Sequence, residues 1–339
     1  MNLENLLRQL AQDAGTLGSL RQMAASRPRR VLLPEAADPR IRLAAAALAK
    51  TGLAHPLLLG RNTLTCAEPD VDAVLGPECW LDPTDESRRR EVAEHLLRRR
   101  RSRGLTPGQS HVLAAEPLYH ATALVALGEA EAMVAGATCA TAAVVRAALW
   151  SVGPAPEVGT VSGAFLMVPP SGQGRCLMMA DCAVVPDPQL EQLDRIAQST
   201  AETYHRLLAR WPAVAFLSFS TRGSAQHPAA SKMADAALRL ATAHPTWSVV
   251  GEVQADAALV PEVALAKDID WGEAGQAEVL IFPDLSSGNI GYKLVERLGG
   301  WRAIGPLLQG LRRPVCDLSR GCTALDIVDA SVLVCLAAE

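Results

Sequence analysis

The pattern that most constrains the fold is a short apolar run, then a loop of small or polar residues, then a helical stretch, and it recurs along the chain. The clearest apolar runs cover residues 30–34, 132–135, 214–219 and 279–282. Alternating strands and helices are typical of a largely parallel sheet with helices packed on its faces. The sequence therefore predicts an α/β protein.

Composition agrees with this fold and argues against several functions. The chain has 339 residues, 49% hydrophobic but only 4% aromatic, so Ala, Val and Leu must build most of the core. The net charge of -4 gives no reason to expect a nucleic-acid partner. The eight cysteines form no CxxC pair and no zinc-site spacing, which indicates free thiols in a reducing cytoplasm. Without a recognisable signal peptide or an apolar run near the roughly 18 residues of a membrane span, we expect a soluble protein.

An antiparallel hairpin is expected where residues 164–168 and 176–180 form two apolar runs joined by the stretch 169–174. The sequence Gly172-Gln173-Gly174 in this stretch is more typical of a turn than of a nucleotide-binding loop. No complete GxGxxG motif is present in the chain. A nicotinamide cofactor is therefore disfavoured.

Three loops that follow predicted strands are candidates for ligand binding. They cover residues 136–141, 220–224 and 286–289, and the helix after the first carries Arg146. A strand, a small-residue loop and a helix can leave backbone N–H groups open for an anion, at the sheet edge where α/β proteins bind ligands. Each loop is equally compatible with an ordinary capped strand-to-helix connection.

A helix over residues 88–103 is predicted to end at Gly104, and its last turns carry Arg98, Arg99, Arg100, Arg101 and Arg103. These cations are either a solvated helix end or a wall that binds a polyphosphate ligand.

The segment 317–326 combines a cation, a hydroxyl and a carboxylate near a predicted helix start. Arg320 beside a helix N-terminus is suited to a phosphate, because the N–H groups and the helix dipole favour an anion there. Asp326 is a possible proton acceptor. It also lies three residues after Thr323, which is the spacing of a capping box and requires no catalysis.

Residues 1–27 are predicted to be helical, with an apolar stripe formed by Leu3, Leu6, Leu7 and Leu10. The stripe is either a packed helix face or an amphipathic segment for a partner or a protein shell. Gly15, Gly18 and Ser19 are a candidate flexible joint behind it.

The order of motifs closely resembles the phosphate acetyltransferase family over most of the chain. The principal segments are FPDL (282–285), GNIGYK (288–293), IGP (304–306), QGL (309–311) and DLSRGC (317–322). Further matches cover 33–35, 136–138, 181–184, 217–220, 223–225, 252 and 254–258. The segments 184–186 and 298–302 are similar to the ethanolamine-utilisation branch.

The resemblance implies a two-domain α/β/α sandwich similar to isocitrate and isopropylmalate dehydrogenases, with the active cleft between the domains. Domain I would comprise residues 1–157 and 311–339, and domain II, inserted and dimerising, residues 158–310. The implied reaction is reversible acetyl transfer between acetyl phosphate and coenzyme A, in a homodimer, without metal or tightly bound cofactor. The expected partners are small molecules, with a microcompartment contact through residues 1–25 as the alternative to a purely cytoplasmic enzyme.

The resemblance also assigns site residues. Ser319, Arg320 and Asp326 take the catalytic places, and Arg100 and Arg146 match arginines that hold substrate phosphates. The other expected substrate-binding residues are Thr141, Ser220, Gly223, Ser224, Gly288, Asn289 and Lys293.

The chain also departs from the family pattern, at Cys139, Ala143, Val185 and Val250. These departures leave open the rate and the acyl-chain preference. A phosphate butyryl- or propionyltransferase and a non-catalytic acetyl-CoA sensor are the alternative functions.

Overall fold

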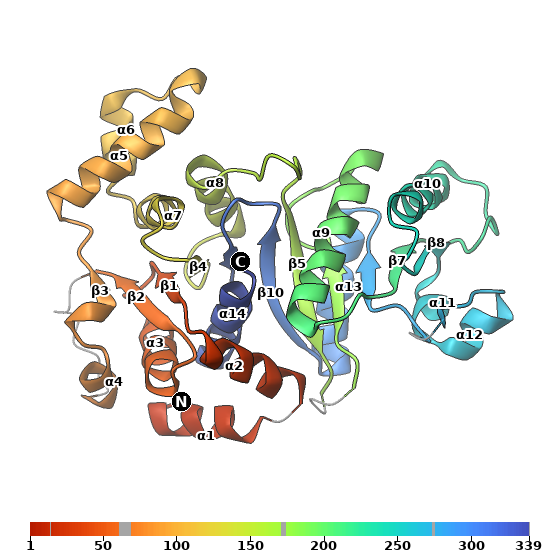
Figure 1. The fold of residues 1–339 in the computed structure, drawn as a ribbon, viewed down its shortest axis with the longest axis horizontal. Helices are drawn as coiled ribbons and strands as arrows, with labels where there is room; N and C mark the ends of the chain where they lie inside the picture. Colours follow the sequence, from red (N-terminus) through yellow and green to blue (C-terminus); the bar gives the residue numbers. More distant parts are fainter. Residues whose placement is uncertain (14, 61–68, 171–173, 273–274, 339) are drawn as a thin grey trace. The chain divides into compact units, whose positions relative to one another are not determined.

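The computed structural model describes residues 1–338 except 14, 61–68, 171–173 and 273–274 (Figure 1). The chain forms two compact units: Met1–Ala155 with Leu311–Glu339, and Pro156–Gly310. We call them unit 1 and unit 2. In the described part of the chain, no helix is both long enough and apolar enough to cross a membrane.

The strands of the unit 1 sheet pair in parallel. Its strands, in spatial order, are β3 (Trp80–Leu81), β2 (His55–Leu59), β1 (Arg30–Leu33), β4 (Ala132–Ala135) and β11 (Val315–Asp317). All residues of β4 and β11 are buried, which is why these strands are continuously apolar apart from Asp317. Because β1, β4 and β11 run in the same direction, the loops that follow them meet at one edge of the sheet.

Helices pack on this sheet. The helices of unit 1 that follow the N-terminal pair are α3 (Pro39–Thr51), α4 (Pro69–Val74), α5 (Glu86–Arg100), α6 (Pro107–Leu113), α7 (Pro117–Leu127), α8 (Thr141–Ser151) and α14 (Ala324–Leu336). α14 packs against α3 and β4 and is buried over most of its length. The predicted helix 88–103 is α5 followed by a 3-10 turn, Arg101–Arg103. Its predicted C-cap is confirmed, since Gly104 has a φ of 88°.

The N-terminal segment forms two helices, α1 (Leu3–Gln12) and α2 (Thr16–Ser26). Leu3, Leu6 and Leu10 are buried, and α1 packs on α3 and α14, so the stripe is a packed helix face. The predicted flexible joint is wrong. Gly18 and Ser19 lie inside α2, and a Cβ at Gly18 would come within 2.6 Å of the Asp13 carbonyl oxygen.

Unit 2 has a mixed sheet. Its spatial order is β10 (Arg302–Gln309), β5 (Ser162–Val168), β6 (Leu177–Ala180), β9 (Val279–Ile281), β7 (Val214–Leu217) and β8 (Val249–Val253). β5 is antiparallel to β10 and β6, whereas β6, β9, β7 and β8 are parallel. The predicted hairpin of β5 and β6 is thus confirmed. The predicted turn through Gly172 and Gln173 lies outside the described residues.

The helices of unit 2 are α9 (Leu190–Leu208), α10 (Pro228–Ala243), α11 (Ala255–Leu259), α12 (Pro261–Ala266) and α13 (Leu285–Gly299). α13 begins five residues earlier than the predicted start at Ile290, so 286–289 is a first helical turn and not a loop. The cause is an N-cap: the Asp284 carboxylate accepts a hydrogen bond from the Ser287 N–H at 2.8 Å. The core of unit 2 includes Phe165 stacked on Tyr292, with ring centroids 4.0 Å apart.

Candidate active site in unit 1

Loops from three neighbouring parallel strands meet at the carboxyl edge of the unit 1 sheet. They are residues 34–38 after β1, 136–140 after β4 and 318–323 after β11. The last two contain predicted site segments. Ligands of open α/β sheets bind at this edge, so the structure brings the predicted loops to a suitable place.

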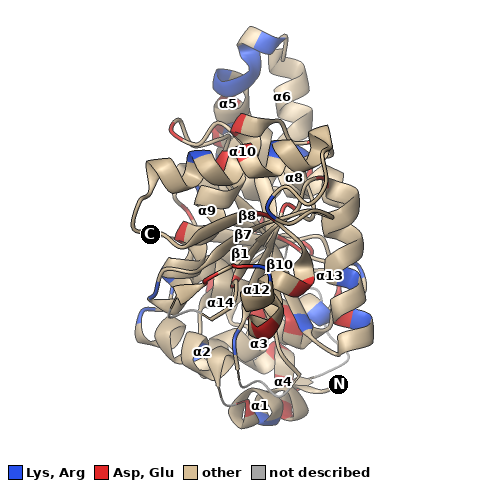
Figure 2. Cartoon of the chain, turned by 90° about the vertical axis from the view of Figure 1, so that its right-hand side faces the viewer, with Lys and Arg blue, Asp and Glu red and all other residues tan. Residues whose placement is uncertain are grey.

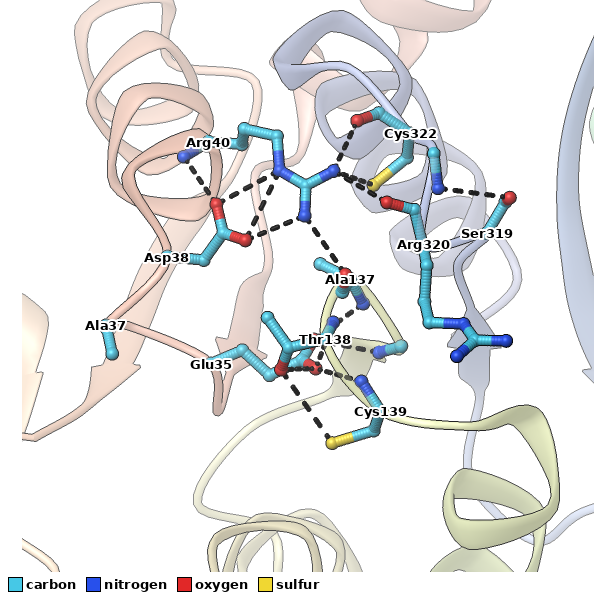
Figure 3. A network of polar contacts seen from close by, with 12 residues as sticks. Glu35, Ala37, Asp38, Arg40, Ala137, Thr138, Cys139, Ser319, Arg320 and Cys322 are labelled. Carbon is cyan, nitrogen blue, oxygen red and sulfur yellow. Dashed lines mark hydrogen bonds and ion pairs between the residues drawn. The ribbon is translucent and has the colours of Figure 1, made fainter.

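Glu35 holds the loop after β4. Its carboxylate accepts hydrogen bonds from the backbone N–H groups of Gly136, Ala137, Thr138 and Cys139 at 2.8, 2.9, 2.8 and 3.1 Å. It also accepts from the Thr138 hydroxyl at 2.6 Å. For residues 136–139, the prediction of open donors for an anion is therefore wrong, because a buried carboxylate of the chain itself already occupies these four N–H groups (Figure 3).

Arg40 holds the loop after β11. Its Nη1 donates to the carbonyl oxygens of Arg320 and Cys322 at 2.9 and 2.8 Å. Its Nη2 donates to the Ala137 carbonyl oxygen at 3.0 Å and to Asp38 Oδ2 at 2.7 Å. The hydrogen bond from Arg40 lowers the pKa of Asp38, and the same bond raises the pKa of Arg40. Arg40 thus links two of the edge loops to the N-terminus of α3.

Ser319 and Arg320 are exposed in this loop. The Ser319 hydroxyl accepts the Gly321 N–H at 3.3 Å. The Arg320 side chain points away from the Arg40 guanidinium in Figure 3. In the part of the chain that the structure describes, the Arg320 guanidinium has no hydrogen-bond or ion-pair partner. The backbone at Arg320 is therefore fixed, while its cation is available to an anionic ligand.

Asp326 forms the capping box that the sequence allowed. Its Oδ2 accepts the Thr323 N–H at 2.9 Å and the Thr323 hydroxyl at 2.8 Å. In return, the Asp326 N–H donates to Thr323 Oγ1 at 3.2 Å, at the start of α14. The half-buried carboxylate lies six residues after Arg320, in the first turn of a helix. A structural role for Asp326 is therefore present whether or not it also accepts a proton.

Asp317 is a buried carboxylate at the end of β11, directly before the loop 318–323. It is 1% exposed, and its Oδ2 accepts the hydroxyl of Thr141 at 2.6 Å. Burial raises the pKa of Asp317 to about 7, against the opposing effect of the Thr141 hydrogen bond. Thr141 is a predicted substrate-binding residue, and the structure uses its hydroxyl to tie the start of α8 to β11.

The raised pKa of Asp317 makes stability depend on pH. A carboxyl group whose folded pKa lies above its unfolded value stabilises the protein fully below about pH 4, and the contribution is lost as pH rises through about 7. We expect Asp317→Asn to gain stability over the wild type by on the order of 3 kcal/mol between pH 4 and pH 8. Chemical denaturation of both proteins across this range measures the difference, and a difference that does not change with pH would contradict the prediction.

Arg100 lies over the ring of Trp150, which in turn packs against Tyr119. The Arg100 guanidinium lies 4.4 Å from the centroid of Trp150, and Tyr119 packs edge-on against the same ring at 5.7 Å. Burial raises the pKa of Tyr119, while the charges of Arg146 and Arg100 oppose that shift. Figure 2 shows the basic residues gathered at the end of α5.

A pocket of about 590 Å³ opens beside Arg100. Arg100, Arg103 and Trp150 line it, together with residues of α6 and of the turn that precedes α6, notably Leu105 and Val112. Cations beside apolar walls suit a ligand that joins a flat ring to phosphate groups.

For the reaction that the resemblance implies, Arg100→Ala and Arg146→Ala are expected to raise KM for coenzyme A about 10-fold, the usual cost of one hydrogen bond to a charged group. Arg88→Ala, at the other end of α5, should leave KM unchanged. Steady-state kinetics with coenzyme A as the varied substrate tests both expectations. Equal effects from the three variants would mean that the arginines act only as a diffuse positive surface.

The predicted site residues Ser220, Gly223 and Ser224 meet around Glu252 in unit 2. Glu252 Oε1 accepts the Ser220 hydroxyl at 2.8 Å and the Gly223 N–H at 2.7 Å. The Ser220 and Ser224 hydroxyl oxygens are 3.2 Å apart, and Ser224 Oγ accepts the Thr221 N–H at 3.0 Å. These polar groups thus hold the loop after β7 in shape.

Gly288, Asn289 and Lys293 lie on α13. A Cβ at Gly288 would approach the Asp181 carbonyl oxygen to 2.3 Å, so the position requires glycine for close packing. Asn289 Nδ2 donates to the Cys182 carbonyl oxygen at 3.1 Å. Lys293 is exposed, with its Nζ 5.8 Å from the ring centroid of Tyr292. Lys293 is therefore the member of this group whose charge faces solvent.

Sequence reasoning did not assign roles to Glu35, Arg40, Asp317 and Glu252. A local signal existed for Arg40, because a cation in the first turn of a helix opposes the helix dipole and calls for a compensating partner. Asp317 also carried a signal, as the one charged residue in an otherwise apolar strand. The partners of Glu35 and Glu252 are distant in sequence and left no local pattern.

Comparison with known proteins shows similarity over nearly the whole chain. The family model described as Phosphate acetyl/butaryl transferase matches residues 16–335. The phosphate acetyltransferase of Paracoccus denitrificans is 39% identical over 323 residues, which cover 94% of this chain and 98% of that protein. A phosphotransacetylase from Streptococcus pyogenes is 35% identical with a TM-score of 0.83, and the match covers 98% of each chain. The EutD phosphotransacetylase from Staphylococcus aureus is 32% identical with a TM-score of 0.82, covering 98% of this chain and 99% of that one.

Proposed function

Because this chain belongs to the phosphate acetyl/butaryl transferase family and is therefore an acyltransferase, we propose that it transfers acetyl groups reversibly between acetyl phosphate and coenzyme A. The observation that carries the proposal is the contrast between the backbone and the side chain of Arg320. Arg40 holds its carbonyl oxygen, whereas its guanidinium has no partner among the described residues. A positioned cation at the carboxyl edge of a parallel sheet suits a phosphoryl group.

In the proposed reaction, the thiol of coenzyme A loses its proton to Asp326 and its sulfur attacks the carbonyl carbon of acetyl phosphate. The bond between that carbon and the bridging oxygen then breaks, and phosphate leaves with the electron pair. Arg320 binds the phosphoryl group and stabilises the charge as it leaves. Ser319, exposed beside Arg320, donates a hydrogen bond to the thiolate or to the oxyanion. The reverse reaction uses the same groups.

In the proposal, the carboxylate of Asp326 that caps α14, and whose Oδ2 accepts the Thr323 N–H and hydroxyl, is also the group that accepts the thiol proton. A thiol with an ordinary pKa of about 8.5 is mostly protonated at neutral pH, so the attack benefits from a nearby acceptor.

Cys322 does not fit the role of a nucleophile. Burial raises the pKa of Cys322 to about 11, and the opposing charge of Arg40 does not compensate. The thiolate is the reactive form of cysteine, so this residue is suited to packing. The proposal therefore contains no acyl-enzyme intermediate.

Substrate binding is proposed for Arg100 and Arg146, which would hold phosphate groups of coenzyme A, and for Lys293 as an exposed cation. We assign Thr141, Ser220, Gly223, Ser224, Gly288 and Asn289 a supporting role, since each already packs or hydrogen-bonds within its own unit. Coenzyme A, acetyl phosphate and phosphate are then the partners, all of them substrates, in a cytoplasmic enzyme.

We also propose a homodimer with unit 2 at its interface. Ile290, Leu294 and Leu298 are spaced four residues apart on α13 and are 58%, 52% and 83% exposed. Such a stripe on one helix face supports contact with another protein surface. Because Leu3, Leu6 and Leu10 of α1 are buried, the proposal does not extend to a microcompartment shell.

Acyl-chain preference tests the proposal against a butyryl- or propionyltransferase. We expect purified protein to release coenzyme A from acetyl-CoA, in the presence of phosphate, with a higher kcat/KM than from butyryl-CoA. A higher value for butyryl-CoA would reassign the substrate within the same reaction. No turnover of either compound, together with measurable acetyl-CoA binding, would favour a non-catalytic sensor.

A further inference from the structure

We propose that Arg40 is a positioning residue for acyl transfer: it fixes the backbone of the loop 319–322 so that the Arg320 side chain is presented to the phosphoryl group. This inference rests on the proposed function. Arg40 itself is assigned no contact with substrate.

The guanidinium of Arg40 is saturated by the chain. Its Nη1 donates to the carbonyl oxygens of Arg320 and Cys322, and its Nη2 donates to the Ala137 carbonyl oxygen and to Asp38. Its Nε donates to Asp38 Oδ1 at 3.1 Å. Arginine has five N–H donors, so each of them has an acceptor within the protein. Arg40 is therefore unsuited to binding substrate phosphate and acts through the backbone that it holds.

The geometry requires arginine at this position. The acceptors lie on three segments: Asp38 is two residues from Arg40 in sequence, Ala137 is 97 residues away, and Arg320 and Cys322 are 280 and 282 residues away. One planar guanidinium reaches them all. Lysine has three donors on a single nitrogen and cannot satisfy the same set. Asp38 orients the fork, since it caps α3 through the Arg40 N–H at 2.8 Å and also accepts from the side chain of Arg40.

Arg40 and Glu35 act on the same loop from opposite sides. Arg40 donates to the Ala137 carbonyl oxygen, while Glu35 accepts the Ala137 N–H at 2.9 Å. Both an N–H group and a carbonyl group of the loop 136–139 are thus hydrogen-bonded. Arg40 connects this loop to the loop 319–322 and so fixes the position of one relative to the other. Groups that stabilise developing charge must be placed before the reaction begins, and a displacement of about 1 Å can cost 10²-fold in rate.

Arg40→Lys is the direct test. We expect kcat for acetyl transfer to fall about 10- to 100-fold, while KM for coenzyme A changes less than about 3-fold, because the Arg100 and Arg146 region is untouched. Arg42→Lys is the matched control. Arg42 lies on the same helix, is buried, and donates to the carbonyl oxygens of Ala36 and Ala37, outside the loop 319–322. Its substitution should leave kcat within about 2-fold of the wild type. Equal losses in the two variants would overturn the proposal.

A double-mutant cycle separates positioning from general stabilisation. If Arg40 acts through Arg320, adding Arg40→Lys to an Arg320→Ala variant should lower kcat by less than about 2-fold, since the presented group is already gone. A full additional loss in that background would contradict the inference. Asp38→Asn provides a second variant. It keeps Arg40 and a side chain that can cap α3, but it weakens the hydrogen bonds between residue 38 and the Arg40 guanidinium. It should therefore also lower kcat.

Two failures remain distinguishable in this design. A wild-type protein that does not convert acetyl-CoA and phosphate would refute the proposed function. An active wild type with an Arg40→Lys variant of unchanged kcat would refute the positioning role alone.

Discussion

Replacing Arg320 by lysine is expected to lower kcat by about 10²-fold or more, the scale seen when one preorganised electrostatic partner of a transition state is lost. Lysine keeps the positive charge but presents a single nitrogen in place of a planar fork, so bidentate contact with the phosphoryl group is lost. The free energy of unfolding should hardly change, because the guanidinium is exposed and has no partner among the described residues. Steady-state kinetics and chemical denaturation of the same preparation measure both quantities.

Arg313→Lys is the matched control for Arg320→Lys. Arg313 is exposed just before β11 and is assigned no role in the site. Its substitution should leave kcat unchanged. If Arg320→Lys retained more than about one third of the wild-type kcat, the guanidinium would not be the group that stabilises the leaving phosphate.

Asp326→Asn is expected to lower kcat by about 10²-fold or more, the scale of general-base assistance, while the protein stays folded. Asparagine keeps an oxygen that can accept the Thr323 hydrogen bonds but is not basic. The loss would therefore report on proton acceptance and not on the helix cap. kcat measured over a range of pH, together with thermal unfolding, provides the data.

Thr323→Ala is the complementary variant. It removes the hydroxyl partner of Asp326 and leaves the carboxylate in place, so it should cost about 1 kcal/mol of stability with little change in kcat. The opposite pattern, with Asp326→Asn nearly fully active and somewhat less stable, would show that Asp326 is only a capping residue.

Much of the fold follows from local patterns. The apolar run 132–135 became β4 with its predicted bounds, because a strand buried on both faces needs an unbroken apolar segment. α13 was predicted too short. Ser, Gly and Asn favour turns locally, but the Asp284 cap and the close packing of Gly288 against Asp181 extend the helix through them.

Ser319, Arg320 and Asp326 lie within one short segment, so the sequence could single them out as candidates, and their catalytic role stays a prediction. The residues that hold the surrounding loops were missed. Glu35 hydrogen-bonds to residues 101 to 104 positions away, and Arg40 to residues as far as 282 positions away. Contacts of this range depend on which strands become neighbours in the sheet, and no local pattern contains that information.

The same long-range contacts explain the incorrect prediction for the loop 136–139. Its small residues and following helix are typical of an anion-binding loop, and the loop does bind an anion. That anion is the carboxylate of Glu35, supplied by the loop after the neighbouring strand β1. An internal carboxylate therefore does what the sequence pattern suggested an external phosphate would do.

The most direct test of the account is the stoichiometry of acetyl-CoA cleavage by the purified full-length chain. We predict that release of coenzyme A requires inorganic phosphate and that one acetyl phosphate forms for each coenzyme A released. Release of coenzyme A without phosphate, with free acetate as the product, would contradict the central claim, because water and not phosphate would then be the acyl acceptor.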